Sequence, residues 1–227
     1  MKIDNNLKKY NMTANARFQS IVLSLTTAVI VLIWKEYGNS FEFPTIVVFL
    51  SGGLISLATY RLLYEFLKFI FSRWRLFRRV ILHKSYLEGT WIGFYIGISG
   101  NIRYIKEEFK QDLNGIIIKG RSFDENKQLH AKWVSDVVRI DDRLSKIKYM
   151  YEVTPIKENM TGYGIADFDL EENNFGIYHR ITGYTSDNHW GQRIKSIEIK
   201  QSAKFKISDS EALAIAENIY EENRGNY

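Results

Sequence analysis

The sequence contains no cysteine among its 227 residues. This absence excludes disulfide bonds, thiolate metal sites and a cysteine nucleophile. The sequence also lacks a P-loop and the GxGxxG, GxSxG and HExxH motifs, and its four histidines do not pair at the spacing of metal ligands. These absences predict a protein that is not an enzyme and has no catalytic residue, no cofactor and no metal site.

Two long apolar runs lie in the first third of the chain. Phe18 to Trp34 is a run of 17 residues without a charge, and Phe43 to Tyr60 is a run of 18. At about 1.5 Å per residue each helix would be roughly 25 Å long, close to the ~30 Å hydrocarbon core of a bilayer. We therefore predict a hairpin of two transmembrane helices joined by the short loop Lys35 to Glu42. The first run is too long for a secretory signal and lacks a cleavage site after it, so we interpret it as a retained anchor.

The two parts of the chain carry opposite net charges. Residues 1–84 contain 12 Lys and Arg against 4 Asp and Glu, whereas residues 85–227 contain 19 against 22. Basic residues precede the first apolar run and follow the second, which predicts that both termini are cytoplasmic. These residues are Lys2, Lys8, Lys9 and Arg17, then Arg73, Arg75, Arg78, Arg79 and Lys84. The acidic balance of residues 85–227 does not favour binding of a DNA or RNA polymer.

From Leu87 onward the apolar residues recur with a period of two, which is typical of β-strands. We predict eight strands, near residues 90–98, 102–112, 115–123, 129–139, 145–154, 162–170, 174–184 and 193–201. Their even spacing and short turns predict an antiparallel meander that closes into a small lipocalin-like barrel, with an open sandwich as the alternative. The predicted domains are thus 1–84, the membrane hairpin, and 85–227, a cytoplasmic all-β domain. Residues Ser208 to Asn223 predict a C-terminal helix, capped by Ser208, that plugs or covers the barrel.

Aromatic and basic residues alternate along several of the predicted strands. Aromatic rings stack on nucleobases, and an Arg guanidinium binds phosphate with two parallel hydrogen bonds. The alternative is that each ring simply belongs to the core. The candidate ligand-binding residues are Trp91, Tyr95, Arg103, Trp133, Tyr149, Tyr151, Arg180, Tyr184 and Arg193. Asp167 and Asp169 share one strand face, and we favour a solvated outer face for them over a paired-carboxylate site.

The order of these features resembles a known family. Two short spans and a basic segment precede Leu87-Glu88-Gly89-Thr90-Trp91-Ile92-Gly93-Phe94-Tyr95, which opens the strand-rich domain. Over essentially the whole chain, this arrangement resembles the two-transmembrane β-barrel effectors of bacterial CBASS anti-phage systems, the SMODS-associated 2TM, β-strand-rich family. The opening pattern Leu-x-Gly-x-Trp-x-Gly-x-Tyr carries the resemblance, and Gly183-Tyr184 loosely fits the Gly-x-Tyr pattern of a late strand in that family.

The resemblance implies a receptor of the bacterial inner membrane. The barrel would bind a cyclic oligonucleotide, a cyclic dinucleotide in our interpretation, made by a partner synthase. Binding would drive self-association of the hairpins into a homo-oligomer that disrupts the lipid bilayer and kills the cell. Two alternatives remain open from the residues themselves. One is a membrane-tethered carrier of a lipid or other hydrophobic ligand, and the other is a membrane enzyme that uses Asp167, Asp169 or His179.

Overall fold

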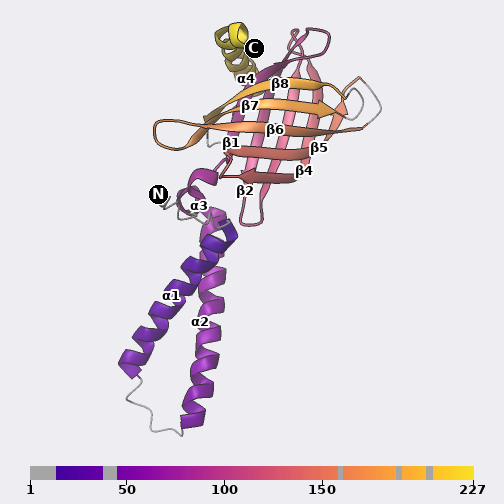
Figure 1. Cartoon of the computed structure of the whole chain (residues 1–227). Helices are drawn as coiled ribbons and strands as arrows, with labels where there is room; N and C mark the ends of the chain where they lie inside the picture. The colour runs from indigo at the N-terminus through magenta and orange to yellow at the C-terminus, as the bar shows by residue number, and fades with distance from the viewer. Residues whose placement is uncertain (1–13, 38–44, 158–160, 188–190, 203–206) are drawn as a thin grey trace, which may run out of the picture. The chain divides into compact units, whose positions relative to one another are not determined.

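The computed structural model describes residues 14–37, 45–157, 161–187, 191–202 and 207–227. The chain separates into two compact units, Met1–His83 and Lys84–Tyr227, drawn in Figure 1. The division falls one residue before the predicted domain boundary. Lys2, Lys8 and Lys9, and most of the predicted loop between the two spans, lie outside the described residues.

The first unit is helical. It contains α1 (Ala14–Tyr37), α2 (Thr45–Arg73) and α3 (Arg75–Leu82), and a short 3-10 helix η2 (His83–Ser85) follows. Within α1, the segment Asn15–Glu36 is long and apolar enough to cross a membrane, a test that a signal sequence also meets. It is the one helix among the described residues found to meet that test. A second crossing, by α2, remains a prediction.

Aromatic rings pack between α1 and α2, and Arg78 caps the C-terminal end of α2. The ring of Phe18 packs edge-on against Tyr64 and Phe71, with centroids 5.6 and 5.9 Å apart. The Nη1 group of Arg78 donates hydrogen bonds to the carbonyl oxygens of Phe71 (2.9 Å) and Ser72 (2.7 Å). The last carbonyls of a helix lack partners within it, so Arg78 caps α2. One residue of the predicted basic cluster therefore has a structural role.

The second unit is an eight-stranded antiparallel barrel in which each strand pairs with the next and β1 pairs with β8. The strands are β1 (Gly89–Ile96), β2 (Ile102–Gln111), β3 (Ile116–Phe123), β4 (Leu129–Asp141), β5 (Lys146–Pro155), β6 (Gly162–Glu172), β7 (Tyr178–Asp187) and β8 (Arg193–Ser202). The predicted closed meander is confirmed, and the open sandwich is wrong.

The largest difference from the predicted strands is the start of β7. The pattern predicted a strand from residue 174, but β7 begins at Tyr178. The side chain of Asn173 explains the delay, because its Oδ1 accepts hydrogen bonds from the backbone N–H groups of Phe175 (3.0 Å) and Ile177 (3.1 Å). This side chain therefore holds the segment in a turn.

Two glycines allow neighbouring strands of the barrel to approach closely. A Cβ atom on Gly93 would lie 1.8 Å from the carbonyl oxygen of Ile197, and one on Gly183 would lie 2.1 Å from that of Asp167. Both contacts are with backbone atoms that cannot move aside. Glycine is therefore required at these positions, as at the kinks of other curved sheets.

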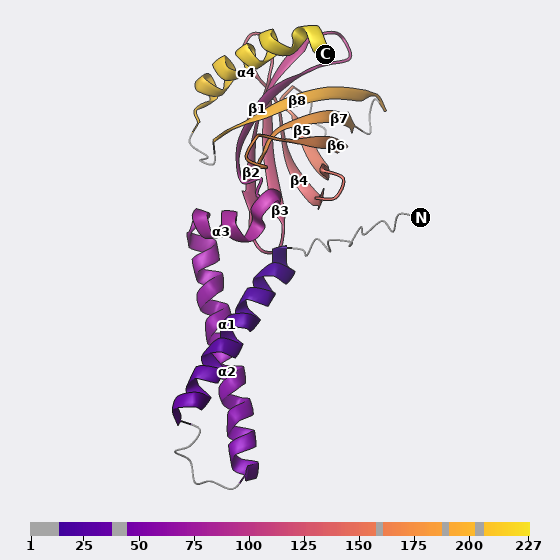
Figure 2. The ribbon, with the colours of Figure 1, turned by 60° about the vertical axis from the view of Figure 1, so that its left-hand side comes forward.

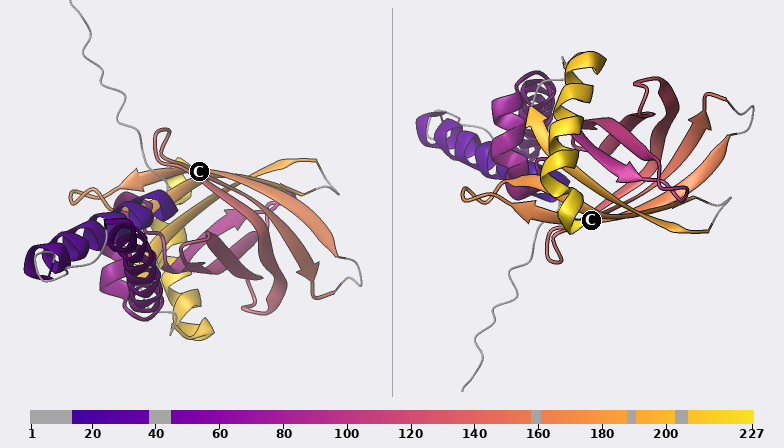
Figure 3. Two further views of the ribbon diagram at one scale, coloured as in Figure 1. Left: turned by 90° about the horizontal axis from the view of Figure 1, so that it is seen from below. Right: turned by 90° about the horizontal axis from the view of Figure 1, so that it is seen from above.

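Helix α4 (Asp209–Asn223) packs on the outside of the barrel. Its residues Leu213, Ala216 and Ile219 form an apolar cluster with Phe94 and Ile197 of the outer wall. Figure 2 and the right-hand view of Figure 3 show the helix lying against the strands. The predicted N-cap is confirmed, because Ser208 Oγ accepts a hydrogen bond from the backbone N–H of Glu211 (3.2 Å). Of the two predicted roles, the helix covers the barrel and does not plug it.

The last residue of the chain joins two strands. The hydroxyl of Tyr227 accepts a hydrogen bond from the backbone N–H of Ile96 (2.9 Å) and donates one to the carbonyl oxygen of Lys195. These backbone groups lie next to the last paired residues of β1 and β8, Tyr95 and Ser196. The Tyr227 side chain therefore bridges the two strands where their own pairing stops.

Candidate functional site

Six of the nine candidate residues lie on the inner face of the barrel wall. Trp91, Trp133, Tyr149 and Tyr151 occupy inward positions in the strand register. Tyr95 and Arg103 are cross-strand neighbours on the same face, where β1 ends and β2 begins. The expected inward orientation of several aromatic faces is therefore confirmed.

The other three candidates lie on the outer face of the barrel. Arg180 donates a hydrogen bond to Oδ1 of Asn223 in α4 (2.9 Å) and lies 3.6 Å from a carboxylate oxygen of Glu171. The guanidinium of Arg193 stacks over the ring of Tyr184, 4.5 Å from its centroid. The structure does not bring these three residues together with the inner aromatic residues.

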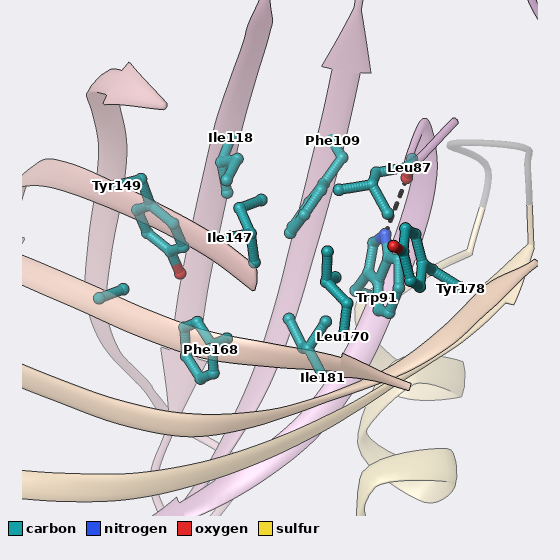
Figure 4. Packing of buried hydrophobic residues seen from close by; sticks show 11 residues of the cluster. Leu87, Trp91, Phe109, Ile118, Ile147, Tyr149, Phe168, Leu170, Tyr178 and Ile181 are labelled. Carbon is teal, nitrogen blue, oxygen red and sulfur yellow. Dashed lines mark hydrogen bonds between the residues drawn. The ribbon is translucent and has the colours of Figure 1, made fainter. Parts of the chain in front are cut away.

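Trp91 belongs to the packed apolar part of the interior (Figure 4). It is fully buried, and its Nε1 donates a hydrogen bond to the carbonyl oxygen of Leu87 (2.9 Å). Its ring packs on that of Phe109, with centroids 5.3 Å apart. Around it lie buried residues such as Leu170 and Ile181. These contacts give Trp91 a structural role in the barrel core.

Two buried glutamates form the polar centre of the interior, and sequence reasoning missed both. Glu107 of β2 accepts hydrogen bonds at Oε1 from Trp133 Nε1 (2.6 Å) and from the Tyr149 hydroxyl (2.9 Å). Glu198 of β8 accepts one from the Ser196 hydroxyl (3.4 Å). A signal did exist for Glu107, because it falls in phase with the inward apolar positions of β2, whereas the inward neighbours of Glu198 on β8 are the polar Ser196 and Lys200. Glu107 lies between Ile105 and Phe109 in that alternation.

Both carboxyl groups have pKa values above that of an ordinary glutamate. Burial raises the pKa of Glu107 to about 7, although the hydrogen bonds from Trp133 and Tyr149 oppose the shift. Burial, together with the charge of the neighbouring Glu107, raises the pKa of Glu198 well above its usual value. Adjacent carboxyl groups with raised pKa values titrate as a pair. Near pH 7 the buried pair is therefore still at least partly protonated.

Each glutamate retains one oxygen that is buried without a hydrogen-bond partner among the described residues, Glu107 Oε2 and Glu198 Oε2. A proton shared between the carboxyl groups would satisfy part of this need. A buried polar atom without a partner costs about 1–3 kcal/mol. The interior therefore holds hydrogen-bonding capacity that the described side chains do not use.

Two aromatic rings on the inner face, those of Trp133 and Tyr151, each lie over a glycine of the neighbouring strand. Trp133 is the cross-strand neighbour of Gly120, and Tyr151 is that of Gly164. A Cβ atom on either glycine would lie only 2.0 or 2.3 Å from the facing ring. The rings of Trp133 and Tyr151 are 6.4 Å apart, and those of Tyr149 and Tyr151 are 5.8 Å apart. We call Glu107, Glu198, Trp133, Tyr149 and Tyr151 the inner polar cluster.

The predicted outer position of the two aspartates is confirmed. Asp167 lies 2.8 Å from Lys148 Nζ, and Asp169 lies 3.0 Å from Lys146 Nζ, all on the outer face. The hydrogen bond from Lys148 lowers the pKa of Asp167. Within the described part of the chain, no group of three or more His, Cys, Asp or Glu side chains could hold a metal ion.

Comparison with known proteins gives little beyond the barrel itself. No family model matches the chain, and no curated protein matches it. The chain is similar to a solved structure of a de novo designed fluorescence-activating β-barrel, at 12% identity and a TM-score of 0.34. That match covers 52% of this chain and 96% of the designed one. At that TM-score the similarity supports no argument about function.

Proposed function

We propose that this chain is a membrane-anchored receptor whose barrel binds a cyclic dinucleotide at the inner polar cluster. The observation that supports this most is the convergence of Trp133, Tyr149 and Tyr151 beside a carboxyl pair with unused hydrogen-bonding capacity. Aromatic rings stack on bases for roughly 1–3 kcal/mol each. A carboxylate accepts hydrogen bonds from base amino groups, and a protonated carboxyl group can donate one to a base acceptor.

Two cations on the inner face are suited to the phosphates of such a ligand. Arg103 is half-buried beside Tyr95. Lys200 is the cross-strand neighbour of Trp91, and its ammonium lies 5.7 Å from the centroid of that ring. A cyclic dinucleotide carries two phosphate charges, and charge-assisted hydrogen bonds to phosphate are about twice as strong as neutral ones. In the proposal, Arg103 and Lys200 supply that positive charge.

The helical unit anchors the receptor. In the proposal α1 and α2 both cross the bacterial inner membrane, and both termini and the barrel are cytoplasmic, in line with the basic residues on either side of the hairpin. Ligand binding drives oligomerisation of the hairpins and membrane disruption, as expected of a CBASS effector. The apolar segment Asn15–Glu36 supports the first crossing.

A carrier of lipid or another hydrophobic ligand is the second candidate function. It is favoured by the apolar part of the interior, where Leu87, Trp91 and Phe109 pack together. An apolar ligand, however, cannot satisfy Glu107 Oε2 or Glu198 Oε2, and burying polar atoms without hydrogen bonds is costly. The polar centre therefore favours a ligand with hydrogen-bond donors and acceptors.

The test is calorimetric titration of the full-length chain in nanodiscs with a panel of cyclic dinucleotides and trinucleotides. At least one cyclic dinucleotide should bind. Replacing Trp133 by Leu should weaken its binding by about 1–3 kcal/mol, roughly 5- to 150-fold. Tyr163→Leu is the matched control, because Tyr163 is an exposed aromatic residue on the outer face. The proposal fails if no member of the panel binds, or if both substitutions weaken binding equally.

A further inference from the structure

A row of apolar side chains lies exposed on the outer face of the middle strands. Val137 of β4, Met150 of β5 and Ile165 of β6 are successive cross-strand neighbours. Their exposed fractions are 62%, 49% and 50%. Helix α4 covers a different part of the wall, on β1 and β2. Contiguous exposed apolar residues on a folded domain are typical of a surface that packs against another molecule.

Other exposed apolar side chains widen this row into a face. Val134 and Tyr163 both pair with Glu152 and form the next row along the strands. We call the whole set the outer apolar face: Ile117, Val134, Val137, Met150, Tyr163, Ile165 and Tyr184, all with at least 43% exposure. The strands that carry it are already paired on both sides in the closed barrel, so a partner would meet this face through side chains.

Two exposed charges of opposite sign lie on either side of the Val137–Met150–Ile165 row, so they could pair between two copies of the chain. On β5, Lys148 lies on one side of Met150 and Glu152 on the other, and both are exposed on the outer face. A two-fold axis along the Val137–Met150–Ile165 row would place Lys148 of each copy opposite Glu152 of the other. Self-complementarity of this kind is what a symmetric dimer interface requires.

We propose that two copies of this chain pack face to face around a two-fold axis along the Val137–Met150–Ile165 row, so that this central row of the outer apolar face contacts the same row of the other copy. The apolar centre with charged residues beside it matches the usual anatomy of a protein interface. An anionic lipid surface fits less well, because two carboxylates also lie beside the row, that of Asp167, 2.8 Å from Lys148, and that of Glu152. The inference does not depend on which ligand the barrel binds.

Disulfide cross-linking tests the contact directly, because the natural chain has no cysteine. In the full-length chain in membranes, Met150→Cys lies on the proposed axis and should form a covalent dimer after oxidation with diamide. Gln201→Cys, at an exposed position on β8, is the control and should remain monomeric. The proposal is overturned if Met150→Cys cross-links no more strongly than Gln201→Cys. That result would also be obtained if the helical hairpins alone held the copies together.

A charge exchange tests the axis and also controls for folding. Within the Met150→Cys chain, Lys148→Glu or Glu152→Lys alone would place like charges opposite each other, and each should lower the dimer yield roughly fivefold. Co-expression of these two variants restores opposite charges at both contacts, so the mixed dimer should recover. Recovery also shows that both variants are folded. If neither variant lowers the yield, or if the mixture does not recover, the proposed axis is wrong.

Discussion

The inner and outer faces of the barrel wall each depart from the usual distribution of polar and apolar residues. Strand β5 shows both, since Tyr149 and Tyr151 point inward, where Tyr149 donates a hydrogen bond to Glu107, while Met150 between them is exposed outside. Stability alone would favour apolar residues inside and polar residues outside. Our two proposals account for both departures: the inner face would bind a polar ligand, and the outer face would pack against a second copy of the chain.

The largest expected loss of stability comes from a substitution in the apolar part of the inner face. Trp91→Ala removes a fully buried ring and its hydrogen bond to Leu87, and should lower the free energy of unfolding by about 3–5 kcal/mol. Denaturant unfolding of the full chain in detergent, followed by circular dichroism, measures it. Tyr163→Ala, on the outer face, should cost far less. Equal losses from the two variants would contradict the assignment of Trp91 to the core.

The next expected effect is a pH dependence of stability that arises from the buried glutamates of the inner face. The pKa of Glu107 is raised to about 7 in the folded chain, so the folded state holds this proton more tightly than the unfolded state does. The contribution of Glu107 to stability should therefore be fully present below about pH 4.5 and fall as the pH rises through about 7, by on the order of 3 kcal/mol. The raised pKa of Glu198 acts in the same direction.

Glu107→Gln removes that titration and should flatten the pH dependence. Unfolding measurements at pH 5 and pH 7.5 on the full chain in detergent provide the test. Glu152→Gln is the control, because Glu152 is exposed on the outer face and its loss should leave the slope unchanged. A wild-type chain that becomes more stable between pH 5 and pH 7.5 would show that the buried pair does not dominate.

A smaller effect concerns the ring that lies over a glycine. Gly120→Ala would place a Cβ atom 2.0 Å from Trp133, so the ring must move, at a cost of about 1–3 kcal/mol. Gly97→Ala is the matched control, because its added Cβ would make only an ordinary contact with Asn101. The melting temperature and tryptophan fluorescence of the two variants report the difference. An unchanged fluorescence in Gly120→Ala would mean that Trp133 is not held over this glycine.

The smallest effect concerns the strand junction. Tyr227→Phe removes two hydrogen bonds to the backbone of β1 and β8 but keeps the ring on Phe94, so it should cost about 1 kcal/mol. Hydrogen exchange at Ile96 should accelerate, because its N–H loses its acceptor. No change at Ile96 would contradict the bridging role of this side chain.

The strands were predictable because alternation is a local signal. Each predicted strand overlaps an observed one, and Ser208 was identified as the helix cap from sequence alone. Which side chains of a strand point into the barrel was harder to predict, because this depends on β-bulges and on closure of the barrel. In β4 the register shifts between Ser135 and Val137, so Val138 and not Val137 continues the inward face. No simple alternation predicts such a shift.

The inner polar cluster was predicted only in part. Its rings, Trp133, Tyr149 and Tyr151, were identified as candidates, but a charged residue in a strand is normally assigned to solvent. For that reason Glu107 and Glu198 were not predicted as site residues. Their role depends on contact between β2 and β8, which are distant in sequence and meet only through the closed barrel. The same closure places Arg180, Tyr184 and Arg193 on the outer face.

The claim that the ligand binds inside the barrel is tested most directly by two tyrosine substitutions. Tyr151 lies on the inner face and Tyr184 on the outer face, and each was a candidate from the sequence. The affinity of the full-length chain in nanodiscs for the best-binding cyclic dinucleotide should fall roughly 5- to 150-fold in Tyr151→Leu and stay unchanged in Tyr184→Leu. A loss of affinity in Tyr184→Leu with none in Tyr151→Leu would place the ligand on the outer face and contradict the account.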